Sequence, residues 1–477
     1  MSNVSLDEIF FPRGIAVVGV SPEDSMSYAT SNVIALLDAG FPSIYPVNPK
    51  YSEACGLKCY PTVSAILGVV DLVIVCIPAE KALDILDDCA KKGVKAVHFF
   101  TAGFGESGDK NREQLEKAVL LKAKASGIRI IGPNCVGLYV PAARVTNTTK
   151  LPMEPGHIGF ISQSGGHSQS MPFQAKLRGL RFSKVISYGN ALDIDECELL
   201  EYFTEDAETE IIAIYIEGVR NGSRFYDMLK RASRKKPVVI YKGGVTESGL
   251  LAAKSHTASL TSSIQVFRTL CRQLNTIQVD DIQEMIDVLV ALCFAIPYPS
   301  GKGIVVVGQG GGPSVQASDQ LESAGLCLPR IPSPVEAELR QFLPMDGAIF
   351  ANPLDATNLT FPDAIGRTFK VLGKVKEVNM MMYHMGFHPV SRWGDGLFAN
   401  DSFLKPMVET LHNAITEIKK PVIVALGPAP DKEGFEEFLQ VQEAFVSAGL
   451  PVFHSLSKAG LAMVRVTTWC SRKGILT

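Results

Sequence analysis

Short apolar runs rich in Val and Ile alternate along this chain with amphipathic segments of about ten to eighteen residues. This alternation is typical of parallel strands that are covered by helices on both faces of a sheet. The first part of the chain predicts a doubly wound sheet, with helices over residues 80–92 and 109–126. Its five predicted strands are GIAVVGVS, SIYPVNP, DLVIVCIP, AVHFFTAG and RIIGPNC.

Two further series of strands follow the loop VTNTTKLPMEPG. The apolar helical run IQEMIDVLVALCFAI and the Pro- and Gly-rich linker PYPSGKG separate them. The strands of the second series are HIGFISQSG, FSKVISYGN, IIAIYIEGV and PVVIYKGG, and those of the third are GIVVVGQGGG, VNMMMYHMG, PVIVALG and PVFHS. The chain is therefore predicted to be an α/β protein of three units, in which the last two share one flavodoxin-like plan.

The length and the composition of the chain exclude several classes of function. At 477 residues the chain is long enough for about three domains. The formal charge of −3 argues against electrostatic binding to nucleic acid or to anionic lipid. The N-terminal stretch MSNVSLDEIFFPRG lacks the pattern of a signal peptide, and no apolar run is long enough to span a bilayer. We expect a cytoplasmic protein that acts on small molecules, whose ten scattered cysteines are mostly buried thiols and form no metal site.

Ligands of open parallel sheets bind at the carboxyl ends of the strands. In the first unit, the residues that follow strand ends are expected to converge on one edge, and Lys50 could meet a phosphate there. Dinucleotide binding is the alternative, but the G-x-G-x-x-G fingerprint is missing beyond its first glycine. The candidate residues at this edge are Gly19, Ser21, Asn48, Lys50, Pro78 and Gly103.

Two later strands run into helices through serines and glycines. Glycine lets backbone N–H groups close around an anion, so each helix start is a candidate phosphate site, although an ordinary capped helix is the alternative. The first start contributes Ser162, Ser164, Gly165 and Gly166, and the second contributes Gly311 and Gly312.

His256 lies in LAAKSHTASLTSS, among small and hydroxylated residues that leave an imidazole approachable. Glu217, at the end of IIAIYIEG, is the carboxylate best placed to support it, with a solvated turn as the alternative role. His167 is either a ligand contact or a helix-surface residue. The stretch YHMGFHPVSRWGDG could line a pocket, but a plain loop is the more ordinary interpretation.

The ordered motifs resemble those of the α subunits of ADP-forming acyl-CoA synthetases, in the superfamily of the succinyl-CoA synthetases. The resemblance covers nearly the whole chain. It is carried by GPNCVG (132–137), SQSGG (162–166), YIEGV (215–219), KSHTASL (254–260), GGGPSVQASD (310–319) and ANPLDAT (351–357).

This resemblance implies three domains. They are a Rossmann-like CoA-binding domain (1–143), a flavodoxin-like domain with a phosphohistidine loop (144–298) and a second flavodoxin-like CoA-ligase domain (299–477). It implies that His256 is phosphorylated, that Glu217 stabilises it, and that the two glycine-containing helix starts receive the phosphate. Asn134 of GPNCVG joins the CoA-binding residues.

The implied reaction is the reversible conversion of acyl-CoA, ADP and phosphate into a carboxylic acid, CoA and ATP. No P-loop and no ATP-grasp segment is recognisable, so the resemblance implies that ADP or ATP and Mg²⁺ bind to a separate β subunit in an α2β2 assembly. Departures from the family pattern occur beside Gly19, after Gly166 and at Ala258. The alternative function is a CoA-binding regulatory protein, or an acyl transferase that needs no nucleotide.

Overall fold

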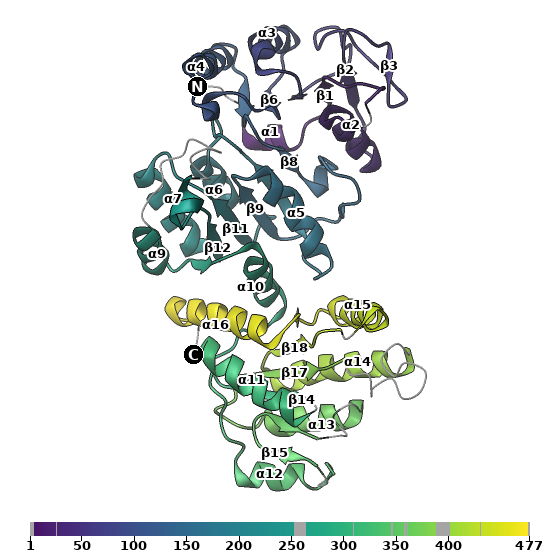
Figure 1. The fold of residues 1–477 in the computed structure, drawn as a ribbon, viewed down its shortest axis with the longest axis vertical. Coiled ribbons are helices and arrows are strands. Elements are labelled where there is room, and N and C mark those ends of the chain that lie inside the picture. Colours follow the sequence, from purple (N-terminus) through teal and green to yellow (C-terminus); the bar gives the residue numbers. More distant parts are fainter. Residues whose placement is uncertain are drawn as a thin grey trace. The chain divides into compact units, whose positions relative to one another are not determined.

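The fold comes from a computed structural model of the 477-residue chain. It describes residues 4–24, 26–251, 264–308, 310–344, 347–356, 359, 361–387, 401–429 and 431–475, without the side chains of 401–403. Two compact units are present: the first contains residues 1–176 and 181–282, and the second contains residues 177–180 and 283–477. Figure 1 labels many of their helices and strands.

The first sheet confirms the five predicted strands, in the spatial order β2-β1-β5-β6-β7. All its neighbouring strands are parallel. The strands are β1 (Ile15–Val18), β2 (Ile44–Val47), β5 (Leu72–Val75), β6 (Ala96–Phe99) and β7 (Arg129–Ile131), and β3 (Glu53–Ala54) and β4 (Leu57–Lys58) form a separate hairpin. The helices are α1 (Leu6–Phe10), α2 (Tyr28–Asp38), α3 (Ala82–Lys92) and α4 (Lys110–Ala125), with 3₁₀ turns η1 (Ala79–Lys81) and η2 (Gly105–Ser107).

The second sheet of the first unit has the order β13-β12-β11-β9-β10-β8, in which only β8 runs antiparallel to its neighbour. Its strands are β8 (Leu138–Tyr139), β9 (Ile158–Ser162), β10 (Phe182–Ser187), β11 (Ile211–Ile216), β12 (Val238–Lys242) and β13 (Ile277–Val279). The helices around it are α5 (Gly165–Lys176), α6 (Glu196–Glu205), α7 (Gly222–Lys235) and α9 (Ile264–Gln273), with the 3₁₀ turn η3 (Pro141–Ala143).

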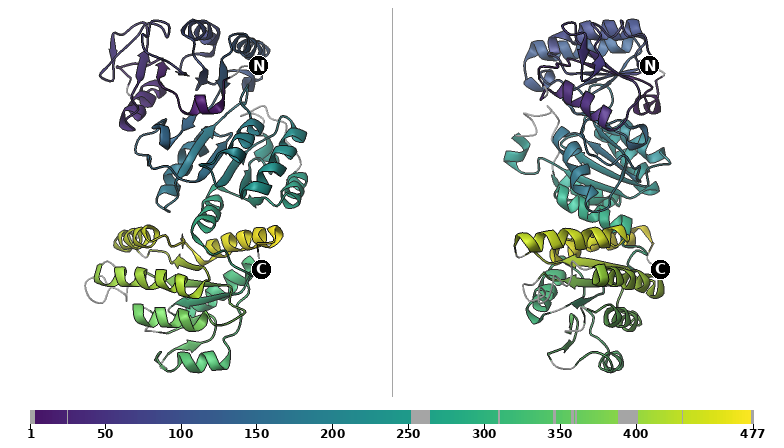
Figure 2. Two further views of the ribbon diagram at one scale, coloured as in Figure 1. Left: turned by 180° about the vertical axis from the view of Figure 1, so that it is seen from behind. Right: turned by 90° about the vertical axis from the view of Figure 1, so that its right-hand side faces the viewer.

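The second unit contains one six-stranded sheet in the order β15-β16-β14-β17-β18-β19, in which only β15 is antiparallel. Helices flank it on both faces, as Figure 2 shows. The strands are β14 (Ile304–Gly308), β15 (Ile349–Phe350), β16 (Leu354–Asp355), β17 (Met380–Met385), β18 (Val422–Leu426) and β19 (Val452–Phe453). The helices are α10 (Ile282–Phe294), α11 (Gly311–Ala324), α12 (Ser333–Leu339), α13 (Pro362–Leu372), α14 (Asp401–Ile418), α15 (Lys432–Ser447) and α16 (Leu456–Lys473).

The parallel strands of all three sheets follow the order 2-1-3-4-5 by their position in the chain. This is the flavodoxin-like order, so the predicted common plan of the second and third series is confirmed. Each sheet has a switch point, where the chain changes direction across the sheet, next to its first strand. The switch points lie between β1 and β5, between β9 and β11, and between β14 and β17. The division of the chain at residues 143 and 298 stays a prediction.

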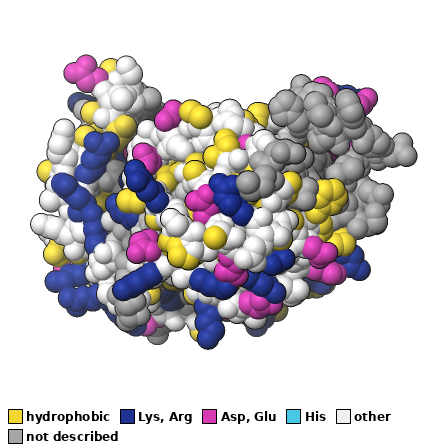
Figure 3. Space-filling model, turned by 90° about the horizontal axis from the view of Figure 1, so that it is seen from below, with side chains coloured by type: hydrophobic (Ala, Val, Ile, Leu, Met, Phe, Trp, Pro, Cys, Tyr) yellow, Lys and Arg dark blue, Asp and Glu magenta, His cyan; other side chains and the backbone are white. Residues whose placement is uncertain are grey.

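The central strands are apolar throughout because helices cover both faces of the sheets. All four residues of β1 and β5 and all six of β11 are buried. Local signals fix the helix ends: Ser5 and Glu8 form a capping box at α1, and Gly93 ends α3 in the left-handed conformation. The surface drawn in Figure 3 carries Lys and Arg side chains interspersed with Asp and Glu.

Candidate functional site

The loops at the carboxyl edge of the first sheet contain the predicted CoA-binding residues. Their strands are neighbours in the sheet, so the loops lie side by side. Asn48 links two of them, because its side-chain amide donates to the carbonyl of Val20 at 2.8 Å and its Oδ1 accepts from the N–H of Lys50 at 3.0 Å. The hydroxyls of Ser21 and Tyr51 lie 3.5 Å apart. The contacts of Ser21, Asn48, Lys50, Pro78 and Gly103 with CoA stay predictions.

Gly19 has a structural reason to be glycine. Its φ is +101°, and a Cβ at this position would lie 2.8 Å from Cγ2 of Ile77 and 2.9 Å from the carbonyl oxygen of Cys76. Any side chain would therefore push the end of β1 away from the end of β5 at the switch point. The departure from the family pattern after Gly19 leaves this close approach intact.

The motif GPNCVG joins the two sheets of the first unit. Asn134 has a φ of +56°, and its Nδ2 donates to Oδ1 of Asn190 at 3.4 Å. Asn190 in turn donates to Oε2 of Glu106 at 2.6 Å, and Oε1 of Glu106 accepts from the N–H of Gly103 at 2.5 Å. Glu106 and Asn190 were not predicted, since neither belongs to a recognised motif. They hold the predicted residues Gly103 and Asn134 in one hydrogen-bonded chain.

The start of α5 lies at the switch point of the second sheet. Ser162, the last residue of β9, donates its hydroxyl to the carbonyl of Ser164 at 2.7 Å. The hydroxyl of Ser164 accepts from the N–H of His167 at 3.3 Å, as a capping serine does. Gly165 and Gly166 are the first two residues of the helix. The predicted strand-to-helix turn is confirmed, and its binding of phosphate stays a prediction.

Glu217 lies across the same switch point, at the end of β11, with 6% of its surface exposed. The side-chain oxygen of Gln163 accepts from the N–H groups of Glu217 at 2.7 Å and of Gly218 at 3.2 Å. The hydroxyl of Tyr215 donates to Oε1 of Glu217 at 3.1 Å. Lys242 donates to the backbone carbonyl of Glu217 at 2.6 Å. The carboxylate is thus held beside the start of α5.

Burial sets the charge of the groups around Glu217. It raises the pKa of Tyr215 well above its ordinary value, so this hydroxyl remains a donor. It lowers the pKa of Lys242, and the nearby charge of Glu217 opposes that shift. His167, at the first turn of α5, packs edge-on against Tyr215 with 4.4 Å between ring centroids. Burial lowers the pKa of His167, with Glu217 again opposing, so its ring is neutral at pH 7.

His256 lies outside the described residues, and its pairing with Glu217 stays a prediction. The same holds for His388, Arg392 and Trp393. His384, which precedes them, lies within β17, and burial lowers its pKa.

The third switch point carries the second glycine-containing helix start. Gly311 and Gly312 are the first residues of α11, and a Cβ on Gly312 would meet no atom within 4 Å. The preceding Gly310 has a φ of +99°, and its N–H donates to Oδ1 of the buried Asp355 at 2.7 Å. Asp355 lies inside ANPLDAT, which explains why that motif accompanies the glycines.

The described residues were searched for metal-binding clusters and for membrane-spanning helices. No cluster of three or more His, Cys, Asp or Glu side chains is arranged there to bind a metal ion. None of the helices described combines the length and the apolar character needed to cross a bilayer.

Comparison with known families agrees with this architecture. Residues 13–141 match the sequence model of a CoA binding domain, and residues 155–292 match that of a succinyl-CoA ligase like flavodoxin domain. Fold and site therefore define a CoA-binding α/β protein of the succinyl-CoA ligase class.

Individual relatives narrow this class. The chain is 32% identical to the α subunit of ADP-forming acetate–CoA ligase I of Pyrococcus furiosus, over 98% of this chain and 99% of the relative. It is 36% identical to the α subunit of ligase II of the same organism, over 79% of this chain and 81% of the relative. The chain belongs to the family of α subunits of ADP-forming acyl-CoA ligases.

A longer relative and a solved structure also match this chain. The ADP-forming acetate–CoA ligase I of Archaeoglobus fulgidus is 32% identical, but the match covers only 54% of its length. Among solved structures, the dinucleotide forming acetyl-coenzyme A synthetase 1 of Ca. Korarchaeum cryptofilum, in complex with phosphate and ADP, superimposes with a TM-score of 0.80. It is 30% identical, and the match covers 99% of this chain and 98% of that one.

Proposed function

We propose that this chain is the α subunit of an ADP-forming acyl-CoA ligase that works through a phosphorylated His256. The observation that carries the proposal is the buried carboxylate of Glu217, which accepts from the hydroxyl of Tyr215 while Gln163 holds the backbone N–H of the same residue beside the start of α5. A carboxylate in this setting can accept a hydrogen bond from one ring nitrogen of a histidine. That bond fixes the tautomer and leaves the other nitrogen free as a nucleophile.

The reaction then has three balanced steps. A phosphate oxygen attacks the thioester carbonyl, the C–S bond breaks, and the CoA thiolate takes up a proton. The free nitrogen of His256 next attacks phosphorus and releases the carboxylate of the acid. Finally a β-phosphate oxygen of ADP attacks phosphorus and frees the imidazole. Each of the two helix starts, at Gly165 and at Gly311, is separately a candidate to bind phosphate through its backbone N–H groups, with a contribution of about 0.3–1 kcal/mol at an exposed site.

The nucleotide step is assigned to a partner. The chain aligns with the α-subunit relatives over up to 99% of their length but with only 54% of the longer Archaeoglobus ligase. We infer that a β subunit of the ATP-grasp type supplies the site for ADP and Mg²⁺, in an α2β2 assembly. Among the described residues, which include all ten cysteines, no disulfide is formed, which favours a protein that works in the reducing cytoplasm.

Reconstitution tests this function. The chain is mixed with its β subunit, an acyl-CoA, ADP, Mg²⁺ and phosphate, and ATP and free CoA are measured. We expect both products in equal amounts from the pair and no ATP from the α chain alone. CoA binding without ATP formation by the pair, over a panel of acyl-CoA thioesters, would instead support the regulatory or acyl-transfer alternative.

A further inference from the structure

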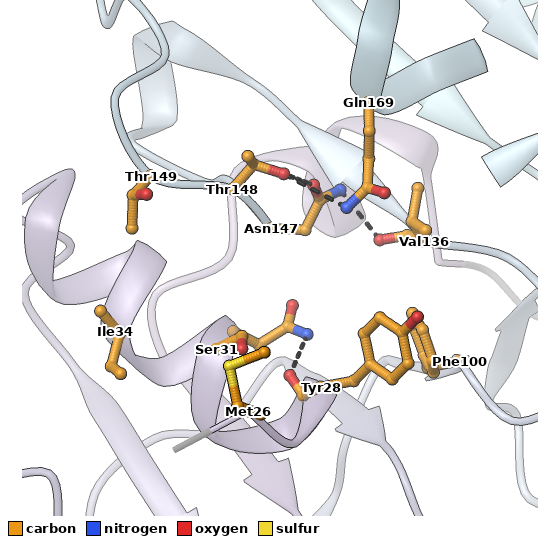
Figure 4. Close-up of a pocket in the computed structure, with 11 residues that line it drawn as sticks. Met26, Tyr28, Ser31, Ile34, Phe100, Val136, Asn147, Thr148, Thr149 and Gln169 are labelled. Carbon is orange, nitrogen blue, oxygen red and sulfur yellow. Dashed lines mark hydrogen bonds between the residues drawn. The ribbon is translucent and has the colours of Figure 1, made fainter. Parts of the chain in front are cut away.

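A pocket of about 400 Å³ opens in the first unit, beside the proposed CoA loops (Figure 4). Its lower wall in Figure 4 comes from α2 and the loop before it, with Met26, Tyr28 and Ser31, and from Phe100 at the end of β6. The opposite wall is formed by Val136 of GPNCVG, by residues 147–149 and by Gln169 of α5. The pocket therefore lies at the carboxyl edge of the first sheet.

Val136 connects this pocket to the proposed phosphate site. It lines the pocket, and a Cβ on Gly165 would lie 3.1 Å from its Cγ1. Gln169 is on the first turns of the same helix that begins at Gly165. A group that enters the pocket from a thioester beside Val136 would keep its carbonyl carbon next to the start of α5.

The pocket is lined by uncharged side chains. Among its described lining residues there is no Lys, Arg, His, Asp or Glu. Burying a carboxylate here would leave it without a countercharge, at a large desolvation cost. Two aromatic rings form one end, because Tyr28 and Phe100 have centroids 4.3 Å apart and planes tilted by 35°. Such a surface favours an apolar or aromatic group over a second acid group.

One polar atom of the lining lacks a partner. Asn32, on α2, is 3% exposed and donates its Nδ2 to the carbonyl of Tyr28 at 2.7 Å. Its Oδ1 is buried and accepts no hydrogen bond from any described residue. The other amides are already engaged: Asn147 donates to Val136 at 3.0 Å, and Gln169 donates to Thr148 at 3.3 Å. Because Oδ1 itself is buried, a ligand in the pocket gains no hydrogen bond from it.

We propose that this pocket receives the acyl group of the substrate and selects uncharged, bulky acyl groups, above all aromatic ones. The proposal rests on the function proposed above. An acetyl group would fill only a small part of such a volume, and a dicarboxylic acyl group would place a bare charge in it.

Calorimetric titration of the full chain with CoA thioesters tests the pocket without requiring turnover. The probes are CoA, acetyl-CoA, succinyl-CoA and phenylacetyl-CoA. We expect phenylacetyl-CoA to bind at least about tenfold more tightly than acetyl-CoA, because it buries a ring. Succinyl-CoA should bind no better than acetyl-CoA.

Two variants test whether the preference comes from this pocket. Ser31→Phe fills the pocket and should remove the preference for aromatic thioesters while CoA itself binds as before. Leu37→Phe adds the same ring to the exposed side of α2 and serves as the matched control.

Equal affinity for all thioesters would overturn the proposal, and so would a loss of CoA binding in Ser31→Phe, which would assign the pocket to the pantetheine arm. Either result is compatible with ATP formation from acetyl-CoA by the wild-type pair, which the reconstitution experiment measures separately. A failure of the pocket is therefore distinguishable from a failure of the proposed function.

Discussion

The pKa of a single buried residue in this chain depends on contacts with residues that are distant in the sequence. His98, in the centre of β6, is 1% exposed, and its Nε2 lies 2.9 Å from the carbonyl oxygen of Cys135. Burial lowers the pKa of His98 to about 4. A Cβ on Gly137 would lie 2.5 Å from Cε1 of the ring, so GPNCVG needs its last glycine for this histidine.

The lowered pKa of His98 predicts a pH dependence of stability. Below pH 6.5 the unfolded chain binds a proton at His98, but the folded chain does not until about pH 4, so stability falls as the pH falls through this window. The loss attributable to His98 should reach about 3 kcal/mol. Urea unfolding followed by circular dichroism at pH 7 and 4.5 should show a smaller decrease in His98→Gln than in the wild type.

The exposed His157 provides the control, since His157→Gln should keep the full wild-type dependence. If His98→Gln and the wild type lose the same free energy on acidification, the buried neutral histidine is not the cause.

The sequence predicted the roles of those residues only that lie at the end of a recognisable strand or at the start of a recognisable helix. Ser162, Ser164 and Glu217 were found because they follow apolar runs, and the structure places them at one switch point. The roles of Gln163 and Asn190 could not be predicted. Each depends on a partner at least 54 residues away in the chain, and no local pattern records such a pairing.

At the scale of elements, the start of α5 has two roles: it packs against a neighbouring loop and it is a candidate binding site. The two glycines that open this helix differ in their surroundings. A Cβ on Gly165 would press on Val136 at 3.1 Å, whereas a Cβ on Gly166 would meet only the hydroxyl of Ser164 at 3.9 Å. One glycine is thus needed for packing, and the other leaves space in front of the helix start.

Alanine at each position should separate these roles. Gly165→Ala should lower the free energy of unfolding by about 1 kcal/mol or more, because Val136 must move. Gly166→Ala should leave it unchanged or raise it by up to about 1 kcal/mol through helix propensity. It should nevertheless reduce phosphorylation of the chain by phosphate and acyl-CoA at least about tenfold, because the methyl group narrows the approach of an anion. Full phosphorylation of Gly166→Ala would contradict a phosphate site here.

The strands with an apolar run of their own were predictable, including the two-residue β19. Every run that predicted a central strand forms one, because burial on both faces demands a continuous apolar segment. The short strands β3, β4, β8, β13, β15 and β16 escaped prediction. They exist because a neighbouring strand offers hydrogen bonds, which is a property of the assembled sheet and not of their own sequence.

At the scale of the whole chain, one short segment departs from the linear order of the units. Residues 177–180 follow α5 but pack within the second unit. There Arg178 forms an ion pair with Asp287 at 2.9 Å, and these side chains are 4% and 3% exposed. Arg178 also donates to the carbonyl of Val452. The second unit therefore includes a four-residue segment that is flanked on both sides in the sequence by residues of the first unit.

Arg178→Met should consequently destabilise the second unit by about 3–5 kcal/mol, because it removes the cation that faces the buried carboxylate of Asp287. Both tryptophans, Trp393 and Trp469, belong to residues 283–477, so tryptophan fluorescence during urea unfolding reports on this unit. Lys374→Met, which breaks an exposed pair with Glu338, should cost at most about 1 kcal/mol. Equal effects of the two substitutions would show that Arg178 is not an anchor.

The proposed mechanism is tested most directly by finding the residue to which a phosphoryl group becomes attached. The purified chain is incubated with radiolabelled phosphate and an acyl-CoA, and the label is located by site-resolved mass spectrometry. We predict an acid-labile, base-stable label on His256 that disappears in His256→Ala, persists in His157→Ala and falls at least about a hundredfold in Glu217→Gln. A label that persists in His256→Ala, or bound CoA with no label at all, would contradict the phosphohistidine mechanism.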